Sequence, residues 1–278
     1  MTTTTIQIDG IAYHTILEGP KDKPVVLLIH ALMSNLHMWD STVGALIKAN
    51  YQTLRFDHIG HNLTPPPEDR SQSYSTEDMT HHMHSIVEQV TGQSHLKAVI
   101  GCSIGGVLAL RYAMLYPSEV ETAISLCAPG IKSLDKAKPL WTQRIQQFEG
   151  DVQEGRDSLS RATVDRWLPG DGPHDEAVRA EALEHVKTCT LEGYKVLADA
   201  IRGYDYSDQL GRLDDVKCMI IAGGRDGAVD ASLLKDVAAQ IQAPKGARFV
   251  LMETAGHIPP MHRADDFEAM VLDVLQEE

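Results

Sequence analysis

The hexapeptide Gly101-Cys102-Ser103-Ile104-Gly105-Gly106 lies between an apolar run, Leu96-Lys97-Ala98-Val99-Ile100, and a helical stretch from Val107 to Leu115. A G-x-S-x-G pentapeptide between a strand and a helix holds its serine on a sharp turn at the end of the strand. Glycine is needed on both sides because a side chain there would collide with neighbouring backbone. Such a turn exposes the Ser103 hydroxyl at one edge of a parallel sheet, where it can act as a nucleophile.

Strands and helices alternate on both sides of this element. Expected strands cover residues 4–9, 11–18, 25–29, 52–57, 96–100, 121–127, 216–222 and 248–252, and expected helices cover 38–49, 75–89, 107–115, 231–241 and 264–275. The alternation predicts the α/β class, with a mostly parallel sheet covered by helices on both faces. Between residues 130 and 212 the periodicity is helical and no strand is expected. We therefore predict a core of residues 1–130 and 213–278, with a helical cap inserted at 131–212.

The composition is that of an ordinary globular protein with an acidic balance. Of the 278 residues, 43% are hydrophobic, and the formal net charge is −14. Nucleic acids and anionic membranes attract clustered Lys and Arg, so neither is an expected partner. No apolar run is long enough for a membrane span. The four cysteines show no C-x-x-C spacing and no secretory signal is visible, which predicts reduced thiols and a cytoplasmic location.

A serine hydroxyl needs a base, and the base needs an orienting acid, before the serine can attack a carbonyl. In α/β-hydrolases the acid and then the histidine follow the serine along the chain. Asp226 and His257 follow in that order, each just past the carboxyl end of an expected strand. We therefore predict Ser103 as nucleophile, Asp226 as acid and His257 as base. Asp230 and His262 are the alternatives for the acid and the base.

Two backbone N–H groups must also face the negative charge that develops on the attacked carbonyl oxygen. We expect one from Ile104, directly after the serine, and the other from Leu32, in the loop after the strand at 25–29. His30 begins that loop. It is expected to brace the loop, because one histidine serves as the base.

Several segments extend the similarity well beyond the serine turn. They are His30-Ala31-Leu32-Met33-Ser34-Asn35-Leu36-His37-Met38-Trp39-Asp40, Gly101 to Gly106, Leu126-Cys127, Trp141-Thr142-Gln143-Arg144-Ile145, Asp165-Arg166-Trp167 and Glu192-Gly193-Tyr194. With them the chain resembles the 3-oxoadipate enol-lactonase branch of the α/β-hydrolase superfamily over nearly its whole length. The resemblance implies the α/β-hydrolase fold, and hydrolysis of a small cyclic ester without a metal or an organic cofactor. It also implies that Trp141 and Arg144 are pocket residues for an acidic substrate.

Three departures from that branch bear on the substrate and not on the chemistry. His30-Ala31 stands where Asn-Ser is frequent, and Asn62 and Thr64 stand where Gly and Ser are usual. Asparagine tolerates left-handed backbone, so the turn at Asn62 should survive. After the expected base, the loop reads Ile258-Pro259-Pro260-Met261-His262 and lacks the usual Asn and Glu.

Other charged residues receive simpler interpretations. Asp78 and His82 lie one helical turn apart and could pair on a metal. No third ligand follows at metal-site spacing, so a solvated helix face is expected and no metal is predicted. Arg111, Arg161 and Arg166 are expected to be surface charges on helices.

The predicted function is cofactor-free hydrolysis of a small carboxylic ester or lactone through an acyl-enzyme on Ser103. Because one fold hosts many reactions, C–C bond hydrolysis or acyl transfer is the alternative, and a ligand-sensing receptor is a third hypothesis. The expected partner is a small ester or lactone, acidic if the resemblance holds. A homo-oligomer stays open.

Overall fold

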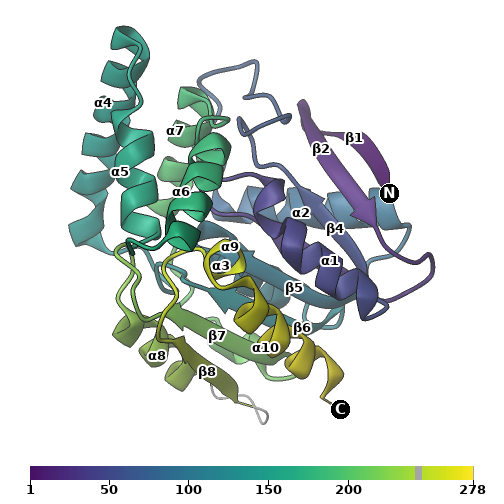
Figure 1. Ribbon diagram of the computed structural model, residues 1–278. Coiled ribbons are helices and arrows are strands. Elements are labelled where there is room, and N and C mark those ends of the chain that lie inside the picture. Colours follow the sequence, from purple (N-terminus) through teal and green to yellow (C-terminus); the bar gives the residue numbers. More distant parts are fainter. Residues whose placement is uncertain (242–245, 278) are drawn as a thin grey trace.

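The computed structural model describes residues 1–241 and 246–277 of the chain. Its strands form one eight-stranded sheet in the order β1-β2-β4-β3-β5-β6-β7-β8 (Figure 1). The strands are β1 (Thr2–Ile8), β2 (Ile11–Glu18), β3 (Val25–Ile29), β4 (Gln52–Phe56), β5 (Leu96–Cys102), β6 (Val120–Leu126), β7 (Lys217–Gly223) and β8 (Ala247–Met252). β2 pairs antiparallel with β1 and β4, and the remaining neighbours pair parallel. The predicted mostly parallel α/β sheet is confirmed.

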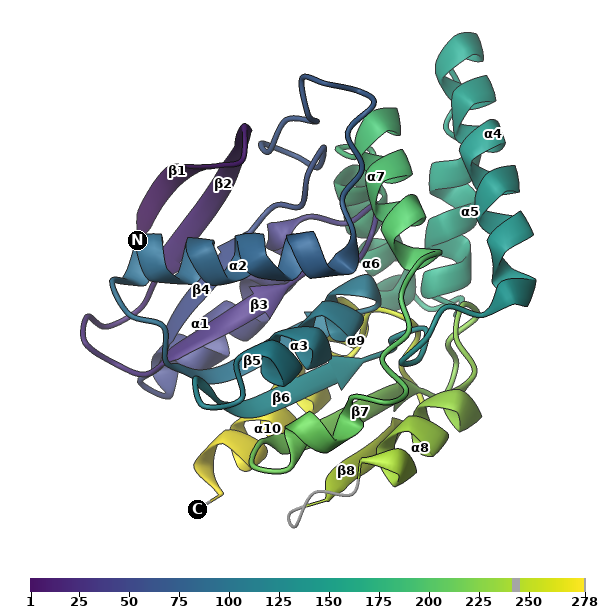
Figure 2. The same cartoon turned by 180° about the vertical axis from the view of Figure 1, so that it is seen from behind.

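Helices cover the sheet on both sides. The core helices are α1 (Asp40–Lys48), α2 (Thr76–Thr91), α3 (Ile104–Leu115), α8 (Ala231–Gln240), α9 (Pro259–His262) and α10 (Ala264–Gln276), with short 3-10 turns η1 (Leu36–Trp39) and η3 (Leu210–Leu213). α1 and α10 lie on one face, whereas α2, α3 and α8 lie on the other (Figures 1 and 2). Because β3 and β5 are covered on both faces, β3 is a continuous apolar run of buried side chains, and β5 is buried and apolar or small except at Lys97.

Four further helices lie between β6 and β7 in the chain. They are α4 (Lys138–Glu154), which follows the short turn η2 (Asp135–Ala137), α5 (Ser158–Trp167), α6 (Pro173–Val186) and α7 (Leu191–Ile201). They stand together beyond the end of the sheet toward which the β6 arrow points (Figure 2). We call residues 131–212 the cap. That the cap is a separate domain stays a prediction.

The cap touches the core closely where the loop after β4 crosses α7. His61, in the loop after β4, pairs in an isolated bridge with Cys189. Nearby, a β-carbon on Gly60 would lie 2.3 Å from the Cα atom of Gly193 on α7. Only glycine on both sides allows this approach, because any side chain would force the two segments apart. The loop after β4 is therefore held directly against the cap.

Arg111 was predicted to be a surface charge, and this prediction is wrong. The side chain is buried on α3, where its Nε donates to Oε2 of Glu77 at 2.6 Å and its guanidinium lies 4.5 Å from the centre of the Tyr206 ring. A cationic group on a buried helix face needs such a carboxylate and aromatic neighbour. Arg161 is exposed on α5 and pairs with Asp157, as a surface charge should.

Asp78 and His82 have structural partners of their own. Asp78 closes a capping box with Ser75 at the start of α2, which satisfies N–H groups at the helix end. His82 is buried, and its Nδ1 lies 2.8 Å from the hydroxyl of Tyr13 on β2. His82 therefore packs against the sheet, and the solvated face expected there is correct only for part of α2.

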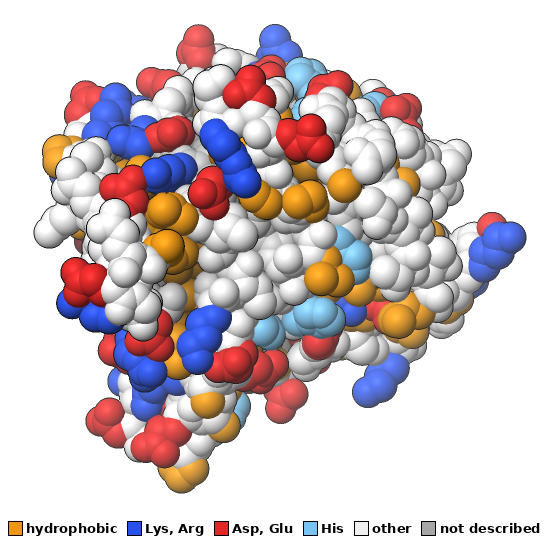
Figure 3. Space-filling view, turned by 90° about the horizontal axis from the view of Figure 1, so that it is seen from above, with side chains coloured by type: hydrophobic (Ala, Val, Ile, Leu, Met, Phe, Trp, Pro, Cys, Tyr) orange, Lys and Arg blue, Asp and Glu red, His pale blue; other side chains and the backbone are white. Residues whose placement is uncertain are grey.

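The molecular surface seen from above carries interspersed acidic and basic side chains (Figure 3). No single-sign patch dominates this face. Within the described residues, no helix has both the length and the apolar character required to cross a membrane.

Candidate active site

Ser103 lies at the turn between β5 and α3 with φ = 57° and ψ = −119°. A residue with a β-carbon rarely adopts positive φ, so the surrounding structure must hold it there. A β-carbon on Gly101 would lie 1.9 Å from the carbonyl oxygen of Gly105, and one on Gly105 would lie 2.3 Å from that of Ile29. The Ser103 N–H donates to the Leu126 carbonyl at 2.8 Å. The predicted need for glycine on both sides of the serine is confirmed.

His257 and Asp226 form a buried pair in the loops after β8 and β7. Nδ1 of His257 donates to Oδ2 of Asp226 at 2.8 Å, and Oδ1 accepts from the N–H groups of Ala228 and Val229 at 2.7 and 3.1 Å. Burial alone would raise the pKa of Asp226, but His257 and the two N–H groups hold it below its ordinary value. Asp226 is therefore ionised and keeps the His257 proton on Nδ1. Nε2 of His257 is left as the basic nitrogen.

The two alternative residues have other tasks. Asp230 is the N-cap of α8, where its Oδ1 accepts from the Ser232 N–H at 2.8 Å. His262 is fully buried; its Nδ1 accepts from the Gly256 N–H at 2.8 Å, and its Nε2 donates to Asp175 at 3.0 Å. Since both ring nitrogens of His262 are occupied, it cannot take a proton from a serine.

Ser103 and His257 line the same pocket, which lies between the core and the cap. The other lining residues, drawn from the core and the cap, are Leu32, Met33, Pro129, Trp141, Arg144, Thr163, Arg166, Trp167, Tyr194, Ile201, Ala228 and Val229. The pocket thus collects five of the predicted site residues, and Asp226 lies directly behind His257. Within the described residues no hydrogen bond joins the Ser103 hydroxyl to His257. Such contacts commonly tighten only when a substrate is bound.

The loop after β3 presents a second feature to the pocket. Leu32 lines the pocket, and its N–H donates to no acceptor within the described chain. Ile104 is the first residue of α3, so its N–H has no partner inside the helix. Both amides are therefore available to an oxygen atom bound near Ser103, as the proposed oxyanion site requires.

Three buried histidines brace this loop. The Met33 N–H donates to Nε2 of His61 at 3.1 Å, and the His58 N–H donates to Nε2 of His30 at 2.9 Å. Nδ1 of His30, Nε2 of His58 and Nδ1 of His61 each donate to a backbone carbonyl, so each ring is held in one neutral tautomer. Burial lowers the pKa of all three, to about 3 for His58 and about 4 for His61. His30 is therefore a brace, as expected, and His58 and His61 share its task.

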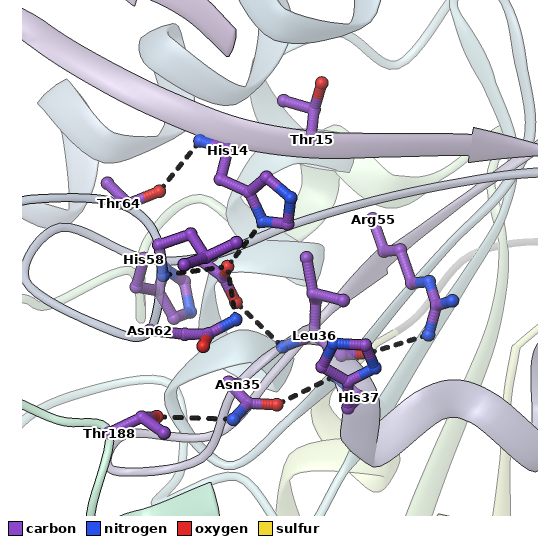
Figure 4. A network of polar contacts seen from close by, with 12 residues as sticks. His14, Thr15, Asn35, Leu36, His37, Arg55, His58, Asn62, Thr64 and Thr188 are labelled. Carbon is purple, nitrogen blue, oxygen red and sulfur yellow. Dashed lines mark hydrogen bonds and ion pairs between the residues drawn. The ribbon is translucent and has the colours of Figure 1, made fainter. Parts of the chain in front are cut away.

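A buried carboxylate ties the same loop to the core (Figure 4). Asp57 accepts from Nδ1 of His14 on β2 at 2.8 Å, from the Leu36 N–H at 3.0 Å, and from Nδ2 of Asn62 at 3.0 Å. Asn62 has φ = 45°, so asparagine does sustain the left-handed turn expected of it. Its amide adds a hydrogen bond that glycine could not make.

The cap reaches this network at Thr188, whose carbonyl accepts from the Asn62 N–H at 3.1 Å. Nδ2 of Asn35 donates to the hydroxyl of Thr188, between α6 and α7, at 3.2 Å, while its Oδ1 accepts from the His37 N–H (Figure 4). The oxyanion-site loop is therefore fastened to the core on one side and to the cap on the other.

A family model for the alpha/beta hydrolase fold matches residues 24–264. The chain belongs to this family. The fold and the expected resemblance to α/β-hydrolases are thereby confirmed.

The relatives of this α/β-hydrolase include several ester-cleaving proteins. The crystal structure of the enol-lactonase from Burkholderia xenovorans LB400 matches with a TM-score of 0.86 and 24% identity, covering 98% of this chain and 100% of that chain. A monoacylglycerol lipase of Homo sapiens is 23% identical over 92% of this chain and 76% of its own length. An AB hydrolase superfamily protein of Bacillus subtilis is 26% identical, over 49% of this chain and 46% of that protein. These likenesses establish the fold, not the substrate.

Arg166 is a charged pocket residue that sequence reasoning missed. It was expected at the surface of a helix, but the last turn of α5 turns its side chain into the pocket beside Arg144. Burial lowers the pKa of Arg166 to about 10, with a smaller contribution from the nearby Arg144. The prediction is wrong because helical spacing cannot show where a cap helix docks. The sequence did offer one indication that Arg166 lies in the pocket: it stands next to Trp167, within a segment that carries the family resemblance.

One group of potential metal ligands occurs in the described part of this hydrolase. Ligand atoms of Cys127, Asp226 and His257 lie within 4.8 Å of one another. Asp226 and His257 are already bonded to each other, and burial raises the pKa of the Cys127 thiol well above its ordinary value. A metal would need the thiolate, so this group fits a metal poorly.

Proposed function

We propose that this α/β-hydrolase cleaves small carboxylic esters or lactones through an acyl-enzyme on Ser103, with His257 as base and Asp226 as its orienting acid. Ser103 attacks the carbonyl carbon while Nε2 of His257 takes the hydroxyl proton. The Leu32 and Ile104 amides stabilise the negative oxygen of the tetrahedral intermediate. The leaving oxygen receives the proton from His257, and water activated by the same histidine releases the acid.

One observation carries this proposal. The His257–Asp226 pair, bonded at 2.8 Å, shares a pocket with a serine held at φ = 57°. Strained backbone at a serine and unpaired amide groups each lower the stability of a fold. Their occurrence together, beside an oriented histidine, therefore indicates a chemical role and not a structural one. The chemistry needs no metal or organic cofactor.

The substrate part of the proposal rests on the cap. The guanidinium of Arg144 lies 5.0 Å from the centre of the Trp141 ring, and both residues line the pocket. Burial lowers the pKa of Arg144, which nevertheless remains protonated at neutral pH. We therefore propose a substrate that carries a carboxylate for Arg144 and an apolar body for Trp141.

The test uses purified protein and two substrates, a neutral aryl acetate and a small lactone that bears a carboxylate. The wild type should turn over both, and a fluorophosphonate probe should label the peptide that contains Ser103. Ser103→Ala should lower kcat by about 10⁶-fold without changing Tm, as loss of the nucleophile does in other serine enzymes. More than a tenth of wild-type activity in Ser103→Ala would contradict the assignment. Turnover of a vinylogous diketone, but of neither ester, would replace ester hydrolysis with C–C cleavage. Consumption of an ester only when an acyl acceptor is present, with the acyl group found on that acceptor, would replace it with acyl transfer.

A further inference from the structure

His262 joins two parts of the molecule through its two ring nitrogens. The side chain is fully buried; Nδ1 lies 2.8 Å from the backbone nitrogen of Gly256, and Nε2 lies 3.0 Å from Oδ1 of Asp175 in the first turn of α6. Burial lowers the pKa of His262, which favours the neutral ring. A backbone N–H can only donate, so Nδ1 is the acceptor and the ring proton is on Nε2. His262 therefore accepts from the loop that carries the candidate base and donates to the cap.

The peptide that His262 holds lies between the candidate base and the candidate acid. Its N–H, that of Gly256, donates to His262, and its carbonyl oxygen, that of Ala255, accepts from the Arg225 N–H at 2.9 Å. Gly256 directly precedes the base, and Arg225 directly precedes the acid. The orientation of this one peptide therefore sets how the loop after β8 meets the loop after β7, and with it how the base meets the acid.

Asp175 is well suited to hold His262 from the cap side. Its Oδ1 also accepts from Nη1 of Arg263, just before α10, at 3.0 Å. Hydrogen bonds from Arg263 and His262 outweigh burial and lower the pKa of Asp175 to about 2, so the carboxylate is ionised at neutral pH. The neighbouring His174 donates through Nε2 to the His262 carbonyl at 3.0 Å. The start of α6 thus fixes both the backbone of His262 and the proton on its Nε2.

The cap also holds the next amide of the same loop. The His257 N–H donates to the Trp167 carbonyl at 2.8 Å, and a β-carbon on Gly256 would collide with that same oxygen. The amides of Gly256 and His257 are therefore both tied to the cap, the first through His262 and the second directly. Trp167 is the last residue of α5 and Asp175 lies in the first turn of α6, so two cap helices act on two neighbouring peptides.

A base that serves a serine must be placed closely. Proton transfer needs the two heavy atoms about 2.6–3.2 Å apart, and a misplacement of about 1 Å can lower the rate about 10²-fold. The residues that line the pocket include His257 and do not include His262. A side chain that holds the loop of the base therefore acts on kcat without touching the substrate.

We propose that His262 is a positioning residue through which the cap, by way of Asp175, sets the place of the base His257. The imidazole of His262 links the peptide before the base to the first turn of α6. This inference rests on the proposed ester hydrolysis and adds a residue to its machinery outside the pocket. It makes the rate of the chemical step depend on a contact between the cap and the core that no substrate touches.

The first experiment separates the two ring nitrogens by their effects on hydrolysis of an aryl acetate. His262→Gln extends its amide to the position of Nε2 and leaves the Gly256 N–H without an acceptor, so kcat should fall by about tenfold or more with KM unchanged. His262→Asn and Asp175→Ala each break the link to the cap but keep an acceptor for Gly256. Each should lower kcat by about threefold, and the double variant should lose no more than either single variant, because both remove the same link.

Arg263→Gln is the matched control for the docking of the cap. It removes the ion pair with Asp175 and touches neither ring nitrogen of His262. It should lower Tm and leave kcat within about twofold. Unchanged kcat in His262→Gln, additive losses in the double variant, or an equal loss of kcat in Arg263→Gln would each overturn the positioning role. If His262→Gln does not fold, the cycle of His262→Asn and Asp175→Ala decides alone.

The second experiment needs no turnover. The proton between Nδ1 of His257 and Asp226 should give a low-field proton NMR signal that is absent in Asp226→Asn. His262→Gln should shift or broaden this signal, and His262→Asn should restore most of it. His14 and Asp57 form a similar buried pair at 2.8 Å, and His14 lies on β2, far along the sheet from β7 and β8, so its signal should stay constant as the internal control. A shifted His257 signal in protein that hydrolyses no ester would contradict the proposed function and support the positioning role. Normal ester hydrolysis with an unchanged signal in His262→Gln would overturn the positioning role alone.

Discussion

Asp226 and Asp230 are four positions apart, and sequence order alone did not decide between them. In the structure, one carboxylate faces the imidazole of His257 at 2.8 Å and the other caps α8 at 2.8 Å from a backbone N–H. The two residues therefore offer a matched pair, since both are aspartates in the same loop region and both accept backbone hydrogen bonds. They differ in their contact with the histidine and in burial, since the Asp226 carboxylate is buried and Asp230 is exposed.

Asp226→Asn should lower kcat/KM for an aryl acetate severely, by about 10⁴-fold on the precedent of serine protease triads, because the amide favours the wrong histidine tautomer. Asp230→Asn should leave turnover within about twofold and cost at most about 1 kcal/mol of stability as a weakened cap. Steady-state kinetics and urea unfolding of both variants measure this. A larger kinetic loss at 230 than at 226 would reverse the assignment.

Arg144 can be tested by its preference for charge. Arg144→Lys should reduce kcat/KM for an acidic lactone, because lysine keeps the charge but loses the planar fork that grips a carboxylate. Arg144→Ala should cost more, about 10- to 100-fold, as expected for a lost charged hydrogen bond. A neutral aryl acetate has no group for the guanidinium and should be spared. Equal losses on both substrates would mean that Arg144 supports the cap and does not select the substrate.

Among single residues, the sequence predicts the role of those whose role depends on their immediate neighbours in the chain. Ser103 lies in a turn that only its flanking glycines permit, and His257 follows a strand at the right point in the chain. Arg166 was not predictable, because its role depends on α5 docking against His257 through Trp167. The sequence pattern of an amphipathic helix is the same whether its charged residue faces solvent or faces a pocket between the cap and the core.

At the scale of elements, the expected strands and helices occur with shifted ends. The helix expected at 38–49 is divided into η1 and α1, because Asn35 caps a 3-10 turn before Asp40 begins the helix. The contacts between the loop after β4 and the loop after β3 were not predictable from periodicity. They are made by histidine rings across a turn, and no spacing rule describes them.

The histidine brace makes a kinetic prediction. His61→Ala removes the acceptor for the Met33 N–H and frees the loop that carries Leu32, so kcat should fall by about tenfold or more. The full loss of one oxyanion donor costs about 10²–10³. His61→Gln offers Oε1 as a replacement acceptor and should recover most of kcat, with KM for the aryl acetate unchanged in both variants. Equal kcat in the wild type and in His61→Ala, or no recovery with Gln, would remove His61 from this role.

At the scale of the whole molecule, the same histidines link folding to pH. His30, His58 and His61 are buried together and neutral in the folded protein, whereas each would titrate at about 6.5 in an unfolded chain. The folded protein therefore contains a cluster that resists protonation, placed directly under the candidate oxyanion site. The cluster should lower the free energy of unfolding only at acidic pH.

The unfolded chain binds more protons than the folded protein between pH 6.5 and the lowered folded-state values, so stability should fall as the pH falls through that window. For His61, whose pKa is lowered to about 4, the loss is about 3 kcal/mol once the pH is below that value. Urea unfolding at pH 7.5, 6, 5 and 4 should show this decline. His61→Gln cannot titrate and should flatten it, while His81→Gln, exposed on α2, should not. If wild type and His61→Gln lose stability in parallel down to pH 4, the histidine cluster is not what makes the fold sensitive to acid.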